Sequence, residues 1–499
     1  MQDFINYMER INMFKQVIAI MEFDSETIAP GGGLAQRAKR AGFFELEVYN
    51  MQTSDTIKNF LDTLAPVLDS QDDIVKALYK EAKDEYDKKV KIPADIMEQY
   101  AKLTEESNDV WRKARKANDF AKFAPYLERI IKLDMKKLEY RKDKIPAGGC
   151  VYDVLLNDYE DDMTVTIYDR FFGTLKGTVV PLLKKVMASE KKIDTSFKNA
   201  VVDIETQRKI SEFIAKKIGY DLNRGYIGVA AHPMCMSTDS TDVRITTRYD
   251  ETDFLSSLYS VLHECGHAIY EQNMGKDIAG SLLGDGTSMG IHESQSRFYE
   301  NVIGRSLEFW EFITPELKEI LPKEFAHVTP QMFFEAANES KPSLIRVEAD
   351  ELTYSLHVII RYEIEKMLFG GECKIADLPQ IWNSKYEEYL GLTPPTYADG
   401  IMQDIHWPIG YFGYFPTYAL GSAYAAQFLH YMKKEMDVSS LIRKGEFSKI
   451  TDWLREKIHK HGSKYTPALL MQKSFGEQLD STHLAEYLTN KYSKLYKLI

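Results

Sequence analysis

Apolar residues recur at spacings of three and four along much of this chain, with charged residues between them, which is the periodicity of amphipathic α-helices. The stretch DIVKALYKEAKDEYDKKVK at 73–91 is one such segment. A second begins at about Pro93, because proline is tolerated in the first turn of a helix, and a third lies near 124–142. The pattern predicts a mostly α protein whose long, charged helices face solvent.

One region departs from this helical pattern. The segment DVRITTRY at 242–249 alternates apolar or β-branched residues with polar ones, as a half-buried strand does. The preceding GYIGVAAHPMCMS contains glycines and a proline. Residues 225–250 are therefore predicted to form a small sheet inside a helical protein. The glycines at 31–33 and the turn at 370–371 are predicted loops.

Composition narrows the class of protein. The chain has 499 residues, 44% hydrophobic and 28% charged, as in ordinary globular proteins. Its formal net charge is −12, with no block of five basic residues, so we expect no nucleic-acid or membrane partner. The four cysteines lie far apart, and the first residues lack the basic and apolar regions of a signal peptide. We expect a cytoplasmic protein.

The segment SVLHECGHAIYEQNMG at 260–275 carries the strongest chemical signal. On a helix, His263 and His267 lie one turn apart on the same face, so their imidazoles can hold one ion between them. Glu264 is rotated by about 100° and can reach a water at the metal. An apolar stripe from Phe254 onward predicts the helix independently, with a cap expected at 250–252.

A helix that merely carries two polar histidines is the alternative, although imidazoles set in an apolar stripe need partners or a metal. Catalytic zinc takes three protein ligands. The pair of histidines has the HExxH pattern, and in its extended form HExxHxxGxxH a third histidine would stand at position 273. That position is asparagine. Glu293, in GIHESQSRFYEN, is the candidate third ligand, on a second helix that Ser288 can cap. An ordinary helix glutamate is the competing interpretation of Glu293.

Six segments in order resemble one known family. They are His232-Pro233-Met234, Asp242 to Thr246, His263 to Gln272, His292 to Ser296, Ile345 to Asp350 and Gly400 to Trp407. Together with the N-terminal FDSETIAPGGGLAQRA, they resemble the carboxypeptidase Taq family of zinc metallocarboxypeptidases over nearly the whole chain. Two departures are Met234, where the family usually has Phe, and Phe23, where it usually has Trp. These two departures bear on which substrates the enzyme prefers and leave the expected metal chemistry unchanged.

The resemblance implies a fold and an organisation. The family fold is mostly α, an elongated helical peptidase of the gluzincin type with a deep active-site groove and a small β-sheet near the metal-binding helices. It implies a single domain over 1–499, with an N-terminal helical lid at 1–90 and a catalytic core segment at 225–420. Family members are typically homodimers.

The resemblance also implies the metal chemistry. One Zn²⁺ per chain, with Co²⁺ or Mn²⁺ as substitutes, would be held by His263, His267 and Glu293. Glu264 would act as the general base that takes a proton from the attacking water.

The carbonyl oxygen needs hydrogen-bond donors as negative charge develops on it. By resemblance, His406 and a tyrosine in HWPIGYFGYFPTYALG supply them. Tyr418 is preferred and Tyr414 is second, with Tyr411 also possible by position. Asp404 is expected to hydrogen-bond a neighbouring histidine.

An exopeptidase must also bind the end of its substrate. Arginine binds a carboxylate with two parallel hydrogen bonds, and Arg346 in LIRVEAD matches the family's candidate. Arg244 in DVRIT is the alternative, although a strand arginine beside aspartates is more often in a structural ion pair. His232 and Gln403 are further substrate-binding candidates.

The sequence thus predicts a metal-dependent carboxypeptidase that releases single amino acids from peptide C-termini with broad specificity. An oligopeptidase or dipeptidase on the same helical scaffold is the alternative enzyme. A metal-free peptide-binding protein is the alternative from a different class.

Overall fold

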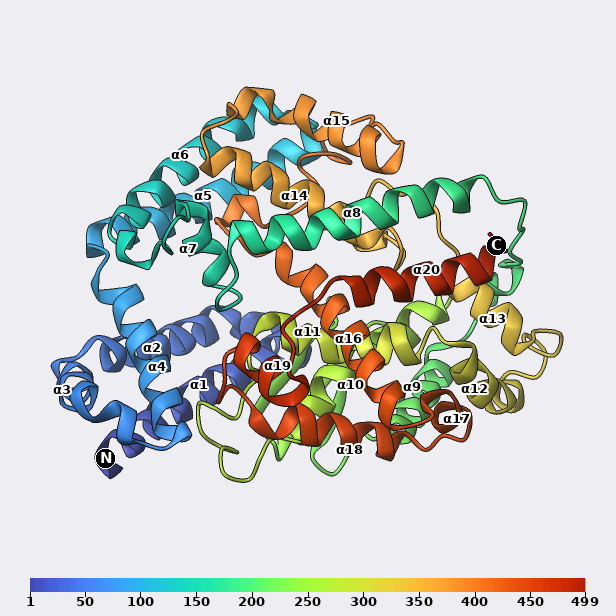
Figure 1. Cartoon of the computed structure of the whole chain (residues 1–499), viewed down its shortest axis with the longest axis horizontal. Coiled ribbons are helices and arrows are strands. Elements are labelled where there is room, and N and C mark those ends of the chain that lie inside the picture. Colours follow the sequence, from blue (N-terminus) through green and yellow to red (C-terminus); the bar gives the residue numbers. More distant parts are fainter. Residues whose placement is uncertain (499) are drawn as a thin grey trace. The chain divides into compact units, whose positions relative to one another are not determined.

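The computed structural model describes residues 1–498 and consists mainly of α-helices with one small sheet (Figure 1). The chain divides into two compact units, each assembled from three separate segments. The first unit comprises Met1–Val90, Ile193–Ala337 and Phe428–Gln478, and the second comprises Lys91–Lys192, Asn338–Gln427 and the chain from Leu479 onward.

The first unit contains the sheet and most of the helices. Its strands are β1 (Gly225–Val229), β2 (Cys235–Asp239) and β3 (Asp242–Thr247). Its helices are α1 (Gln2–Thr27), α2 (Leu34–Thr53), α3 (Asp55–Leu64), α4 (Asp73–Val90), α9 (Ile204–Ile218), α10 (Phe254–Gln272), α11 (Met289–Arg297), α12 (Leu307–Ile320), α13 (Pro330–Ala337), α17 (Val438–Arg443), α18 (Phe447–Lys457) and α19 (Pro467–Phe475).

The second unit is helical, and α8 and α20 run side by side within it (Figure 1). Its helices are α5 (Ala94–Ala117), α6 (Phe120–Glu139), α7 (Val151–Asn157), α8 (Val165–Met187), α14 (Tyr354–Phe369), α15 (Leu378–Leu390), α20 (Thr482–Tyr496) and α16 (Pro416–Glu435), within which the division of the chain falls.

Short helical turns join these elements. The 3-10 turns are η1 (Gly31–Gly33), η2 (Ala65–Ser70), η3 (Lys142–Lys144), η4 (Ser196–Asn199), η6 (Arg346–Glu348), η7 (Ile375–Asp377), η8 (Trp407–Ile409) and η9 (His459–His461). A π-helical turn, η5 (Phe298–Ile303), continues directly from α11. Such π turns inside helices are frequent at functional sites.

Most of the predicted elements are confirmed, with small corrections at their ends. The segment at 73–91 forms α4, and α5 begins directly after Pro93. The sheet region holds three strands in the order β1-β3-β2, with β3 parallel to β1 and antiparallel to β2. The prediction for 31–33 was wrong, since these glycines form a 3-10 turn. Asp253, rather than 250–252, caps the HExxH helix by accepting from the Ser256 amide.

Residues 1–90 form four helices whose apolar faces meet in one cluster, including Phe4, Ile11 and Leu61. Ile278 and Leu283, from the loop between α10 and α11, are buried in the same cluster. That loop is therefore anchored to the N-terminal helices. The function of 1–90 as a lid stays a prediction.

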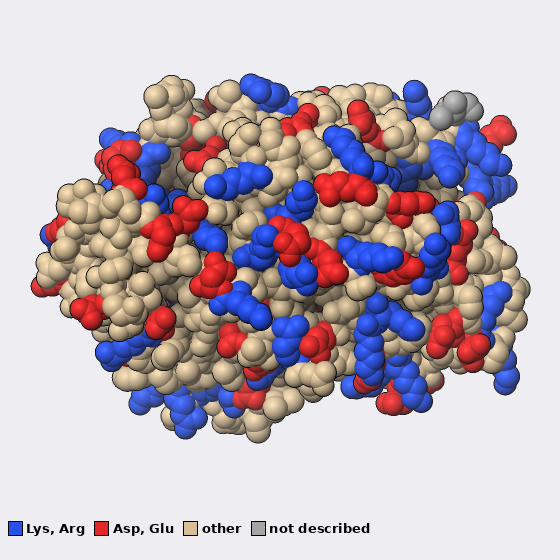
Figure 2. All heavy atoms as spheres, turned by 60° about the horizontal axis from the view of Figure 1, so that its bottom comes forward, with Lys and Arg blue, Asp and Glu red and all other residues tan. Residues whose placement is uncertain are grey.

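The surface agrees with the solvated helix faces expected from the charge pattern. Basic and acidic side chains are interspersed over the face drawn in Figure 2. Pairs four residues apart, such as Lys58–Asp62 and Lys132–Glu128, bridge single helices on the surface. None of the helices described for residues 1–498 combines the length and apolar character needed to cross a bilayer.

Helices α10 and α11, which carry the predicted metal ligands, pack closely against each other. Gly266 on α10 lies against the backbone of α11, where an added Cβ would stand 2.4 Å from the Gln295 carbonyl oxygen and 2.6 Å from the Ser296 Cα. Backbone atoms cannot move aside as a flexible side chain does. Only glycine therefore allows the two helices to approach this closely.

We expect Gly266→Ala to lower the free energy of unfolding by about 1–3 kcal/mol, the usual cost of overpacking. Gly177→Ala is the matched control, because Gly177 lies inside α8 with nothing within 4 Å of the added Cβ. There the substitution should stabilise by about 0.5–1 kcal/mol through helix propensity. Urea unfolding of both variants measures the difference. Equal effects would contradict the steric explanation.

Candidate active site

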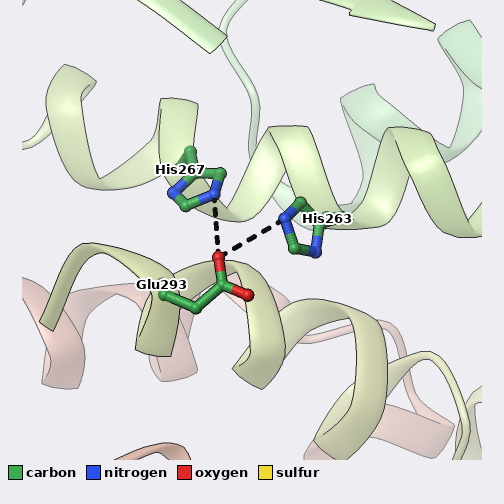
Figure 3. A group of neighbouring side chains, drawn as sticks. All are labelled: His263, His267 and Glu293. Carbon is green, nitrogen blue, oxygen red and sulfur yellow. Dashed lines mark ion pairs between the residues drawn. The ribbon is translucent and has the colours of Figure 1, made fainter. Parts of the chain in front are cut away.

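Two imidazoles and one carboxylate converge where α10 meets α11 (Figure 3). The Nε2 atoms of His263 and His267 lie 3.6 and 3.5 Å from Oε2 of Glu293. The two histidines come from successive turns of α10, and the glutamate comes from the first turns of α11, where Ser288 caps the helix as predicted. The three ligand-type atoms expected from the sequence are thus brought together.

The outer nitrogen of His263 has its own carboxylate partner. Its Nδ1 lies 2.8 Å from Oε2 of Glu300, which belongs to the π-helical turn η5. Arg297 and Arg305 donate to the two oxygens of Glu300. Burial opposes ionisation of Glu300, yet these arginines and His263 hold its pKa well below the usual range. A carboxylate in this position fixes the imidazole so that Nε2 is presented to a metal.

Arg297 also orients Glu293. Its Nε donates to Oε1 of Glu293 at 2.7 Å, which leaves Oε2 directed at the two histidines. Burial alone would raise the pKa of Glu293, but the charges of Arg297 and His263 keep the pKa well below the usual range. The carboxylate is therefore ionised, which is the form in which a carboxylate can bind a metal.

The Nδ1 atom of His267, which faces away from Glu293, begins a second chain of contacts. This nitrogen lies 2.5 Å from Nδ1 of His292, and Nε2 of His292 lies 2.6 Å from Oε1 of Glu271. Both ligand-type histidines are thus oriented from behind, one by a carboxylate and one by an imidazole that itself has a carboxylate partner.

Glu264 is 6% exposed and follows His263 on α10. Burial raises the pKa of Glu264 to about 7, while the neighbouring His263 acts in the opposite direction. A base with a pKa near the working pH transfers protons most effectively.

These residues fit a divalent metal ion. Two imidazole nitrogens and one carboxylate oxygen, all within 4.8 Å of one another, are the three-ligand set that leaves a tetrahedral ion one open position. The partners behind both imidazoles complete the arrangement typical of such centres.

In the second unit, Arg346 lies in a network of buried charges. Its Nε and Nη2 donate to Oδ1 of Asp404 at 3.1 and 3.0 Å, and its Nη1 donates to the Tyr354 hydroxyl. Arg361 donates to Oδ2 of the same aspartate. The prediction that Asp404 hydrogen-bonds a histidine was wrong, since its carboxylate accepts from two arginines instead. Burial opposes its ionisation, but both arginines hold its pKa below the usual range.

His406 and the tyrosines of the following segment lie near one another. His406 Nε2 is 3.3 Å from the Tyr418 hydroxyl, and its ring is 5.3 Å from that of Tyr414. The guanidinium of Arg346 lies 4.9 Å from the Tyr418 ring. Tyr411 is 45% exposed, with its ring against Tyr414. Burial lowers the pKa of His406 to about 4, so the imidazole is neutral at neutral pH.

Glu365 supports this segment and was missed from the sequence. It is fully buried on α14, and its oxygens accept hydrogen bonds at 2.7 Å from Tyr152 Oη, Trp407 Nε1 and the Gly413 amide. These bonds fix both sides of the loop after His406. Nothing in the helical pattern around 365 distinguishes this glutamate from the half-buried Glu363 and Lys366, so no sequence signal pointed to it.

The remaining substrate-binding candidates have structural partners. Arg244 forms a bidentate ion pair with Asp242, at 2.7 and 2.5 Å, as expected for a structural pair. Gln403 accepts from the Arg346 amide and donates to the Leu344 carbonyl, so it holds the segment that carries Arg346. His232 is exposed in the turn before β2.

Arg297 and Glu300 were also missed, although a signal existed. They follow Glu293 by four and seven positions, so all three share one helix face in ESQSRFYE.

A mostly helical chain in which an HExxH helix meets a carboxylate from the next helix belongs, by class, to the metallopeptidases.

The comparisons with known proteins define the family. The carboxypeptidase Taq (M32) metallopeptidase family matches residues 3–492, and the chain belongs to this family. It is 43% identical to carboxypeptidase 1 of Bacillus subtilis, over 100% of this chain and 99% of that protein. It is 37% identical to thermostable carboxypeptidase 1 of Thermus thermophilus, over 99% and 98%. The protein is thus a metallocarboxypeptidase, which hydrolyses peptides with the help of a divalent metal.

A solved structure supports the fold. The crystal structure of an M32 carboxypeptidase from Deinococcus radiodurans R1 is 32% identical and superposes with a TM-score of 0.94, over 99% of both chains. The mostly α fold with one small sheet is therefore confirmed as the fold of this family.

We expect Glu300→Gln to weaken metal binding about 10- to 100-fold, because a neutral amide orients His263 less strongly than a carboxylate does. Competition with a chelator measures the affinity. Glu308→Gln is the control, since Glu308 pairs with an arginine, Arg443, on the surface. If the two variants bind metal equally well, Glu300 does not support the site.

Proposed function

We propose that this metallocarboxypeptidase holds one zinc ion through His263, His267 and Glu293, and releases single amino acids from peptide C-termini with broad specificity. The supporting observation is that two imidazole nitrogens and one carboxylate oxygen converge while other side chains hold each of them from behind. The same ligand chemistry accepts Co²⁺ or Mn²⁺, which we propose as substitutes for Zn²⁺.

When bound, the ion would supply Lewis acidity and lower the pKa of its water to roughly 7. Glu264 accepts the proton of the attacking water and passes it to the leaving amine. Its burial and its pKa of about 7 support both steps, because the same carboxylate must take up a proton and then release it. Arg297 keeps Glu293 ionised and oriented throughout.

Arg346 binds the C-terminal carboxylate of the substrate. A guanidinium has five N–H donors, and the contacts to Asp404 and Tyr354 use one on each nitrogen. One N–H on each terminal nitrogen is left for a substrate carboxylate. Because Asp404 and Gln403 hold it, Arg346 is already oriented before substrate binds, which reduces the entropic cost of recognition.

His406 and Tyr418 donate hydrogen bonds to the carbonyl oxygen as charge develops on it. A neutral imidazole and a phenol can both donate, and one such donor is typically worth about 3 kcal/mol in the transition state. The contacts of Tyr418 with both His406 and Arg346 favour it over Tyr414 and over the more exposed Tyr411. His232 and Arg244 are assigned secondary contacts with substrate.

The remaining proposals concern the organisation of the enzyme. We propose that the enzyme is cytoplasmic, since all four cysteines are free thiols. The homodimer implied by the family resemblance is proposed with it. Residues 1–90 act as a movable lid, and 225–420 form the catalytic core segment of one peptidase domain.

We expect Glu264→Gln to keep the metal but to lower kcat about 10²- to 10⁴-fold, because the amide cannot accept the proton. Elemental analysis reports the metal, and the products of one unstructured peptide report hydrolysis. Removal of the metal by a chelator should abolish activity in the wild type, and added Zn²⁺ should restore it. Full activity of the glutamine variant would exclude Glu264 as the base.

We expect Arg346→Ala to raise KM about 10- to 100-fold for peptides with a free C-terminus, since a charge-assisted pair is worth about 1.5–3 kcal/mol. Arg244→Ala is the matched variant and should change KM much less. A C-terminally amidated peptide should resist the wild type. Cleavage of the amidated peptide would favour an oligopeptidase, and a larger effect at Arg244 would reverse the two assignments.

A further inference from the structure

A second group of side chains of metal-ligating types lies in the first unit, behind the proposed zinc ligands. Glu271 is at the end of α10, His292 is in the first turn of α11, and Asp285 is in the loop between these helices. One ligand-type atom from each lies within 4.8 Å of the other two. A carboxylate pair with one imidazole nitrogen is a ligand set that suits zinc and similar divalent ions.

The loop that carries Asp285 is held tightly in this position. An added Cβ on Gly286 would stand 2.4 Å from Cδ2 of His292, so only glycine lets the backbone approach the imidazole so closely. Leu283 anchors the loop in the apolar cluster of the N-terminal helices, and its carbonyl accepts from the Ser463 amide. The Thr287 amide donates to the Tyr270 hydroxyl. The three side chains therefore meet on a rigid frame.

These side chains open into a cavity that favours a cation. It has a volume of about 420 Å³ and is lined by four carboxylates and a single ammonium group, that of Lys15. Glu271 is 3% exposed at its inner end, whereas Asp285 is exposed at the surface, so an ion has a path from solvent. Cys235 also lines the cavity, but its sulfur lies outside the group of three ligand-type atoms.

We propose that Glu271, Asp285 and His292 form a second site for a divalent ion of the zinc type, and that its occupancy weakens binding at the catalytic site. The existence of the second site follows from the cluster and its cavity. Its antagonism rests on the proposed function, because it requires His267 to be a ligand of the catalytic metal.

The antagonism follows from the protons on two facing imidazoles. A neutral imidazole carries one N–H, so His267 with Nε2 on a metal keeps its proton on Nδ1. That proton is donated to Nδ1 of His292, 2.5 Å away, and the proton of His292 must then lie on Nε2, facing Glu271. An ion bound to Nε2 of His292 displaces this proton to Nδ1, where it meets the N–H of His267. The two sites therefore require different positions for one proton of His292, so an ion at either site weakens the binding of an ion at the other.

The test counts bound Zn²⁺ in the full-length enzyme by equilibrium dialysis and follows hydrolysis over the same Zn²⁺ concentrations. The wild type should bind a second ion and lose activity as it binds. In Asp285→Asn, the second ion should be lost while full activity is kept, and the Zn²⁺ concentration that halves activity should rise at least about tenfold. Asp239→Asn is the control, because Asp239 lines the cavity but bonds Thr241 and lies outside the cluster. It should behave as the wild type.

Two results would overturn the second site: a single bound ion in the wild type at every Zn²⁺ concentration, or inhibition of Asp285→Asn at the same concentration as the wild type. Glu293→Gln separates this proposal from the proposed function. It should lose the catalytic ion and keep the second. If it retains both ions, the catalytic ligand assignment fails, while the loss of one ion in Asp285→Asn still supports the second site.

Discussion

The close contact of α10 with α11 at Gly266 is the constraint on which the metal chemistry depends. The HExxH helix supplies two nitrogens in any environment that keeps it helical, but two nitrogens do not make a catalytic centre. The proposed third ligand, Glu293, comes from another helix, and its carboxylate reaches the two imidazoles only because no side chain separates the two backbones at Gly266. One missing Cβ thus allows a pair of histidines to meet a third ligand-type atom.

Each of the two units contains a buried carboxylate that arginines neutralise. A buried carboxylate is costly unless several donors satisfy it. Glu300 meets this requirement with two arginines and an imidazole, and Asp404 meets it with Arg346 and Arg361. Such networks are rigid because each member loses its partners if it moves. They hold His263 in one unit and Arg346 in the other at fixed orientations, at the expense of desolvation.

Local sequence patterns predicted the elements well and their partners poorly. The three- and four-residue periodicity located α4 and α5, and the alternation at 242–249 located β3, because these signals come from neighbours along the chain. The sequence predicts a histidine as the partner of Asp404, whereas the structure pairs it with two arginines. Arg361 lies far from Asp404 along the chain, and the pattern of its helix does not indicate that it faces this aspartate. Glu365 was missed for the same reason.

The sequence by itself determined the helical class and the family, and it predicted the histidine pair and the third ligand, because the residue types and spacings that carry this chemistry are local or recur in fixed order. The tertiary structure decided what lies behind these predicted ligands. It brought Glu300 to His263, and His292 with Glu271 to His267, and it pressed the loop of Asp285 onto His292. Such contacts depend on how closely backbones approach in three dimensions. That distance is set by packing between elements, which no spacing along one helix records.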